Sequence, residues 1–356
     1  MSWFLLILII AVLWIVAVTL LSGPDLRQFD VDVGEHFEAH PEDIEATQRL
    51  LGQLQKVRKE AVDTKSITKG LALVREFADN LSADLETDTQ FTEVDIYGLA
   101  AEWAVAKGAD SNRRVLFLHG GAFIFGSPKG HRKLADRLSK IANASVLSVD
   151  YRMLPENGRK ASIIDAQHAY HWILNNGPDG KAPANFLVVS GDSAGGNLAL
   201  MLSSWSKRNA SQRPDAVVAF SPSTDMTMVS PTLKSNRKTD KILGEGLGLI
   251  TKVPLPVRAW VGLFSLRLNP ANELASPVFG DLLKLPPTLI QASSNEMLLG
   301  ESVRYTNRAL AMGSDVTLQI WQEQIHDWHL FNMGYGSAET AWTEVEKFIK
   351  EIERKA

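Results

Sequence analysis

The segment 191–195, Gly-Asp-Ser-Ala-Gly, constrains the fold of this chain more than any other. An apolar run at 185–190 precedes it, and a helical pattern at 197–202 follows it. A strand that turns sharply into a helix needs small residues at the turn, and the strained turn holds the serine hydroxyl out at the end of the strand. The pattern therefore predicts that Ser193 is a nucleophile on an α/β sheet. The competing interpretation is an ordinary glycine-lined turn.

A serine nucleophile needs a base to take its proton and a carboxylate to orient that base. In this architecture the chain order is serine, acid, histidine. Of the eight histidines, only His326 and His329 follow Ser193, and both lie just after the alternating run 316–321. We select His326 as the base, because His329 would require a longer loop and suits the start of a helix.

The carboxylate is expected at the end of the strand before the one that carries the histidine. Glu296 lies there, directly after the apolar run 287–293. Glu301 falls inside the following helical pattern, and Asp315 lies at the wrong end of the next strand. Glu296 is therefore the predicted third member of a catalytic triad.

Backbone donors for an oxyanion are expected in the segment His-Gly-Gly-Ala-Phe at 119–123, which follows the apolar run 114–118. Two glycines allow the backbone to turn its N–H groups toward the space above Ser193. The N–H of the residue after the serine lies at a helix N-terminus, where negative charge is stabilised. The predicted oxyanion hole consists of Gly120, Gly121 and Ala194.

The ordered motifs between Arg114 and Phe331 resemble those of the hormone-sensitive-lipase-like α/β-hydrolases, the bacterial family IV esterases. In that family a serine, an aspartate and a histidine form the triad. The resemblance implies an α/β-hydrolase fold with a mostly parallel sheet, a helical cap, and cleavage of carboxylic esters through an acyl-enzyme. The motifs that carry it are 119–127, 148–156, Asp165-Ala166, 191–198, Ser221-Pro222, Pro286-Pro287 and His326-Asp-Trp.

Two positions depart from the family pattern. Glu296 stands where the family usually has aspartate, and Ala122 stands where it has a third glycine. Glutamate also serves as the acid in α/β-hydrolases. We interpret Asp192 as support for the turn at Ser193. Four further residues, Asp150, Tyr151, Arg152 and Glu156, are expected to form a structural network that braces the glycine loop.

Other activities use the same fold and triad, because neither determines the leaving group. An amidase, a lactonase or a deacetylase is therefore an alternative to an esterase. A ligand receptor on a hydrolase scaffold is a further alternative, as the plant gibberellin receptors illustrate within this resemblance. Those receptors lack the histidine, whereas Ser193, Glu296 and His326 are all present here, so we expect an enzyme.

Composition narrows the remaining classes. The chain has 356 residues, 45% of them hydrophobic, a net charge of −4 and no cysteine. This length suits one catalytic domain, and no basic stripe with interleaved aromatic residues indicates a nucleic-acid partner. Without cysteine there is no disulfide and no thiolate metal site. No metal-binding or nucleotide-binding motif is visible, so we expect no metal and no cofactor. A homodimer is left open.

The N-terminus carries an uncharged apolar run from residue 3 to residue 21. As a helix with a rise of 1.5 Å per residue, it nearly covers the ~30 Å hydrocarbon core of a bilayer. It exceeds the apolar region of roughly 7–15 residues that is typical of a cleaved signal peptide, which is the alternative. We expect a single-pass membrane anchor. Arg27 is the only basic side chain near the run, so the charge pattern leaves the orientation open; we favour an extracytoplasmic catalytic domain.

The resulting organisation has three parts. Residues 1–24 form the anchor or signal peptide, residues 25–90 an N-terminal helical cap segment, and residues 91–356 the catalytic domain with a cap insertion at about 225–275. Alternating apolar runs predict strands at 93–97, 102–106, 115–119, 145–150, 186–190, 216–220, 288–292 and 316–321, and helices at 130–143, 163–175 and 302–312.

Overall fold

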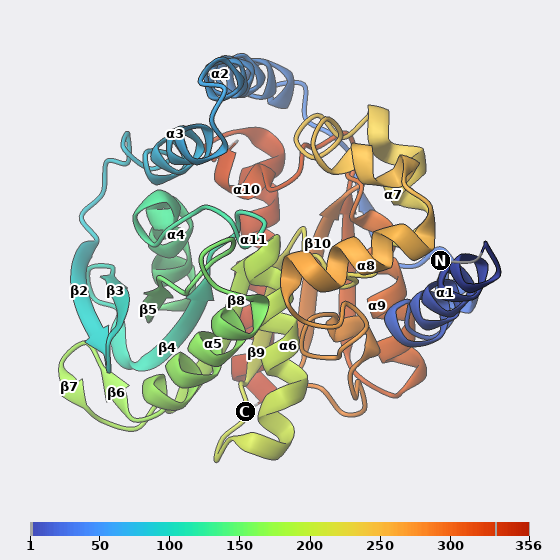
Figure 1. Ribbon diagram of the computed structural model, residues 1–356. Helices are drawn as coiled ribbons and strands as arrows, with labels where there is room; N and C mark the ends of the chain where they lie inside the picture. Colours follow the sequence, from blue (N-terminus) through green and yellow to red (C-terminus); the bar gives the residue numbers. More distant parts are fainter. Residues whose placement is uncertain (1–2, 332, 356) are drawn as a thin grey trace.

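The computed structural model describes residues 3–331 and 333–355. Residues 1–2 of the predicted anchor and residues 332 and 356 of the predicted catalytic domain lie outside the described residues. A nine-stranded sheet forms the centre of the protein (Figure 1). In sheet order its strands are β1 (Glu35–Phe37), β11 (Val316–Trp321), β10 (Thr288–Ser293), β9 (Ala216–Phe220), β8 (Phe186–Asp192), β4 (Asp110–Leu118), β5 (Ala144–Val149), β3 (Leu99–Val105) and β2 (Gln90–Ile96).

The sheet is mostly parallel, as predicted. Every neighbouring pair from β1 to β5 is parallel, whereas β3 pairs antiparallel with β5 and with β2. All eight predicted strands are present. The ninth, β1, lies in the segment predicted to be helical and pairs with β11. Three residues are too few to show a period in the sequence, and the partner strand lies far along the chain.

Helices cover both faces of the sheet (Figure 1). On one face, α4 (Arg132–Ala142) and α11 (Gly336–Lys355) pack against the sheet residues Val115 and Phe117. On the other face, α5 (Arg159–Ile173), α6 (Ala194–Asn209) and α9 (Leu299–Ala311) join the core that contains Leu116 and Leu118. Successive side chains of a strand point to opposite faces, so β4 contributes to both cores.

Two helices from the N-terminal segment, α2 (Asp43–Asp63) and α3 (Ile67–Asp79), pack against each other. Leu50 of α2 is buried against Trp321, Ile325 and Trp328, which surround the loop that follows β11. Helix α2 thus lies close to the carboxyl end of β11. A short antiparallel pair, β6 (Asn176–Gly177) with β7 (Gly180–Lys181), lies apart from the main sheet.

A long insertion separates β9 from β10. It contains α7 (Thr232–Ser235) and α8 (Leu255–Leu266). The side-chain amide of Asn236 donates hydrogen bonds to the backbone carbonyls of Ser294 and Glu296, at 2.9 and 3.0 Å. Asp240 accepts a hydrogen bond from the N–H of Met297. The insertion is therefore tied to the loop that follows β10.

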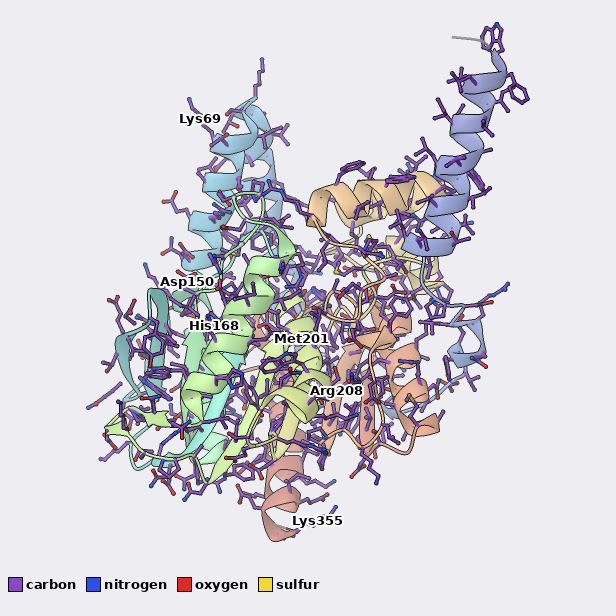
Figure 2. The ribbon with its side chains drawn as sticks, turned by 60° about the horizontal axis from the view of Figure 1, so that its bottom comes forward. Lys69, Asp150, His168, Met201, Arg208 and Lys355 are labelled. Carbon is purple, nitrogen blue, oxygen red and sulfur yellow. The ribbon has the colours of Figure 1, made fainter. Side chains whose placement is uncertain are left out.

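The apolar N-terminal helix begins as α1 (Trp3–Val16) and continues through Ala17–Leu21. Figure 2 shows it leading away from the body of the protein. With 19 residues and a mean hydropathy of 3.2, the helix is long and apolar enough to cross a membrane. Of these residues, only Ala17 and Leu21 are buried.

Candidate active site

Ser193 occupies a strained turn between β8 and α6. Its φ of +50° and ψ of −111° are unusual for a residue with a side chain. A Cβ at Gly195 would lie 1.8 Å from the carbonyl oxygen of Leu118, and one at Gly191 would lie 2.5 Å from the backbone of Gly195. Only glycine fits at these two positions. The predicted strand–turn–helix around Ser193 is therefore confirmed, and the residue is 8% exposed.

His326 lies between Ser193 and Glu296, in the loop between β11 and the short helix α10 (Trp328–Phe331). Its Nε2 is 2.9 Å from Ser193 Oγ, and its Nδ1 is 2.7 Å from Glu296 Oε2. The other carboxylate oxygen of Glu296 accepts a hydrogen bond from the N–H of Ser293 at 2.9 Å. All three side chains are buried. The three residues selected from the sequence thus form one hydrogen-bonded chain, with the geometry of an acyl-transfer triad.

The residues set aside in the sequence lie elsewhere. His329 Nε2 is 2.8 Å from the side-chain oxygen of Gln291, and burial lowers the pKa of His329 well below its usual value. Glu301 accepts hydrogen bonds from the N–H groups of Thr224 and Asp225. Asp315 precedes β11, at the opposite end from His326. None of the three contacts Ser193 Oγ among the interactions that residues 3–331 and 333–355 show.

A second carboxylate lies beside His326. Asp327 is buried, and its Oδ2 is 3.1 Å from His326 Nε2, the nitrogen that faces Ser193. Burial opposes a charge on His326, but the negative charge of Asp327 and the hydrogen bonds with Asp327 and Glu296 hold the pKa of His326 well above its usual value. Burial in turn raises the pKa of Asp327 to about 7, and the charge of His326 counteracts that rise.

The glycine loop differs from the prediction at one position. The N–H of Gly120 donates a hydrogen bond to Asp192 Oδ1 at 3.0 Å. This N–H is therefore not free to meet an oxyanion, which corrects the expectation for Gly120. The N–H groups of Gly121, Ala122 and Ala194 donate no hydrogen bond within the described residues.

Ala122 has a φ of +55°, in the left-handed region. This conformation is costly for a residue with a Cβ, which explains why glycine suits the position in the resembled family. The N–H of Ile124 donates to the carbonyl of Gly121 at 2.9 Å and closes the turn. The loop thus holds its strained shape without a third glycine.

The glycine loop is braced from several sides, and two of the four residues predicted to brace it, Tyr151 and Glu156, take part. Asp192 Oδ2 also lies 3.3 Å from His131 Nε2. The hydroxyl of Tyr151 donates to the carbonyl oxygen of His119 at 2.6 Å, and their rings stack. Arg75 donates to the carbonyl of Ile124 and forms an ion pair with Glu156. Arg152 pairs instead with Asp165, one step further from the loop.

Four supporting residues were missed in the sequence: His131, Asn236, Asp240 and Asp327. The first three act from elements far along the chain, so nothing local indicates their contacts. Asp327 directly follows the selected histidine, but adjacency in the sequence does not by itself place a carboxylate against the ring. Across residues 3–331 and 333–355, no group of three or more His, Cys, Asp or Glu side chains is arranged to hold a metal ion.

Comparison with known proteins places this geometry in a family. A model of the α/β-hydrolase fold family matches residues 115–330. An acetyl-hydrolase from Streptomyces hygroscopicus is 34% identical over 232 residues, which cover 65% of this chain and 73% of that protein. An esterase from Acinetobacter venetianus is 29% identical over 264 residues, covering 74% of this chain and 83% of that protein.

Solved structures of bacterial esterases are also similar to this chain. A crystal structure of an esterase from the bacterial hormone-sensitive lipase family is similar with a TM-score of 0.71 and 29% identity, covering 85% of this chain and 97% of that chain. An esterase/lipase from an uncultured bacterium has a TM-score of 0.70 and 30% identity, covering 88% and 99%. The chain belongs to the α/β-hydrolase family, in its branch of hormone-sensitive-lipase-like bacterial esterases. It is a carboxylic-ester hydrolase, and the comparisons do not favour the amidase, lactonase, deacetylase or receptor alternatives.

Proposed function

We propose that this hydrolase cleaves its ester through Ser193, His326 and Glu296. The observation that carries the proposal is the unbroken hydrogen-bonded chain from Ser193 Oγ through both ring nitrogens of His326 to Glu296 Oε2. In such a chain, the ring takes the hydroxyl proton at one nitrogen while the carboxylate orients it from the other.

The reaction has two halves. Ser193 Oγ attacks the ester carbonyl carbon as its proton moves to His326 Nε2, and a tetrahedral oxyanion forms. The bond to the alcohol oxygen then breaks, and His326 returns the proton to that oxygen, which leaves an acyl-enzyme. A water attacks the acyl carbon and gives its proton to His326, and Ser193 leaves with the proton as the acid is released. Glu296 stabilises the imidazolium in both halves.

We assign the oxyanion to the N–H groups of Gly121 and Ala194, with Ala122 as a further donor in place of Gly120. Gly121 and Ala122 lie in the glycine loop after β4, and Ala194 begins α6 directly after Ser193; all three N–H groups are free of internal acceptors within the described residues. Fixed donors of this kind stabilise the charge that develops in the transition state, and removing one typically costs about 3–4 kcal/mol.

A serine-directed alkyl phosphonate tests the assignment. It should label the full-length protein once, and mass spectrometry should locate the adduct on Ser193. Ser223→Ala is a matched control, because Ser223 lies close by and donates its N–H to the carbonyl of Ser193; this variant should be labelled normally. An adduct on another residue, or normal labelling of Ser193→Ala, would contradict the proposal.

We further propose that residues 1–24 attach the enzyme to a membrane as a single-pass anchor, with an extracytoplasmic catalytic domain. The length, hydropathy and exposure of the helix Trp3–Leu21 support this. Segments 25–90 and 225–275 then act as a cap. Two contacts support that role. Leu50 packs beside the loop that carries His326, and Asn236 binds the backbone of the loop that carries Glu296.

A further inference from the structure

The apolar N-terminal helix is held by α8 of the insertion. Ala17 and Leu21 are buried against Ala259, and Trp260 and Leu263 pack beside them. The indole N–H of Trp260 donates to the carbonyl oxygen of Leu13 at 3.2 Å. The side-chain amide of Asn269, just beyond α8, donates to the carbonyl of Leu20 at 2.9 Å. Helix α8 therefore contacts the last two turns of the 19-residue span.

This contact fixes the depth of α8 if the span crosses a bilayer. Nineteen residues at 1.5 Å each cover about 28 Å, barely the thickness of the hydrocarbon core. No turn of the span can then be left in water, including the turns from Leu13 to Leu21 that pack on α8. Helix α8 must accordingly lie at the level of the membrane surface. In Figure 2 it lies across the base of the projecting helix, and Lys355 marks the opposite end of the protein.

The outer face of α8 has the composition of an interfacial helix. Val257, Val261 and Phe264 follow an i, i+4, i+7 spacing on one face and are 50, 46 and 72% exposed. The exposed basic residues Lys252 and Arg267 lie just before and just after α8. An apolar stripe flanked by cations suits the boundary between acyl chains and anionic headgroups.

A second element of the proposed cap points the same way. Ile67, the first residue of α3, is 92% exposed and lies between the exposed residues Lys65 and Lys69. Figure 2 shows Lys69 on the side of the protein from which the N-terminal helix projects. Two elements that are almost 200 residues apart thus present apolar side chains with flanking lysine or arginine on the side of the anchor.

We infer that α8 lies in the surface of a lipid bilayer with Val257, Val261 and Phe264 among the lipids, so that the cap rests on the membrane. The inference depends on the proposed anchoring by the N-terminal helix. Because α8 packs directly against the proposed anchor, we take the occupant of the stripe to be lipid rather than a second copy of the chain.

Single-cysteine labelling tests this in the full-length protein, because the natural chain has no cysteine. An environment-sensitive fluorophore is attached to Phe264→Cys, Val257→Cys or the anchor variant Ile10→Cys. Leu283→Cys and Leu310→Cys are the controls; these residues are 47 and 44% exposed, and they precede β10 and β11, at the far end of the sheet. Each variant is reconstituted in phosphatidylcholine–phosphatidylglycerol vesicles with and without a lipid-borne quencher, and folding is checked by circular dichroism.

The lipid-borne quencher should remove most of the emission at positions 264, 257 and 10, and little at 283 and 310. Quenching at position 10 but not at 264 and 257 would overturn the inference and leave the anchor intact. No quenching at position 10 would refute the anchoring, and the inference with it. Shielding of position 264 from an aqueous quencher without lipid quenching, together with dimers on cross-linking, would assign the stripe to a second copy and also overturn it.

Discussion

Asp327 Oδ2 lies 3.1 Å from His326 Nε2, the ring nitrogen that also faces Ser193 Oγ at 2.9 Å. The proposed base therefore has a carboxylate on each side of its ring, since Glu296 binds the other nitrogen. Negative charge on both sides favours the imidazolium, whereas attack by Ser193 needs the neutral ring.

The pH profile should report this pair. Activity rises as His326 loses its proton, and Asp327 raises the pKa of His326. Asp327→Asn removes that charge, so the acidic limb of kcat/KM for a p-nitrophenyl ester should move to lower pH. Asp315→Asn, at an exposed carboxylate beyond the other end of β11, should leave the limb in place. An acidic limb that stays fixed or moves to higher pH in Asp327→Asn would contradict the account.

The two buried glutamates near the site should respond differently to amidation. Glu296→Gln removes the charge that stabilises the imidazolium, and kcat should fall by about 10³–10⁴-fold. Burial and the neighbouring charge of Asp225 raise the pKa of Glu301. Its carboxylate accepts hydrogen bonds from backbone N–H groups, which a glutamine oxygen can also accept, so Glu301→Gln should change kcat little. Steady-state kinetics on both variants decides; a larger loss in Glu301→Gln would show that the wrong acid has been assigned.

Asp192 should act on catalysis through the glycine loop rather than through the substrate. Asp192→Ala removes the acceptor for the N–H of Gly120 and the partner of His131. Misplaced oxyanion donors should lower kcat by about 10–10²-fold, below the cost of deleting a donor outright. Labelling of Ser193 by the phosphonate should slow by a similar factor, because its rate also depends on oxyanion stabilisation. Unchanged kcat with a loss of thermal stability would assign Asp192 a purely structural role.

Membrane attachment should survive treatments that disrupt electrostatic binding. Full-length protein should stay in the membrane pellet through carbonate and high-salt washes, because an uncharged helix of 19 residues inserts by hydrophobic transfer. Sequencing of the mature N-terminus separates the anchor from its alternative. A mature chain that starts after about Ser22 would establish a cleaved signal peptide.

Most of the sheet and the triad could be predicted from local sequence, because each depends on short-range rules. The small residues of a strand-to-helix turn indicate Ser193 as the proposed nucleophile. The loops that follow two later strands indicate Glu296 and His326 as its proposed partners. The same short-range rules do not show which backbone N–H groups are available to an oxyanion. Whether the N–H of Gly120 is free depends on where the Asp192 side chain points, and that contact joins residues 72 positions apart. They also fail for β1, whose only signal is its partner β11.

The contact between α8 and the N-terminal helix could not be predicted from the sequence either. From the sequence, α8 is only part of the cap insertion predicted at about 225–275, and nothing in its pattern names the N-terminal helix as its partner. The structure shows α8 packed on the N-terminal span rather than on α2 or α3. The pairing of Trp260 with Leu13 spans 247 positions, beyond any periodicity in the chain.

Ester hydrolysis by Ser193→Ala tests the central claim most directly. The variant should fold, as judged by circular dichroism, and kcat for p-nitrophenyl butyrate should fall by about 10⁴–10⁶-fold, since the donors of the oxyanion hole alone leave only residual catalysis. Ser223→Ala, prepared in parallel, should retain most of its activity. A folded Ser193→Ala protein that hydrolyses the ester at close to the natural rate would contradict the assignment of Ser193 as the nucleophile.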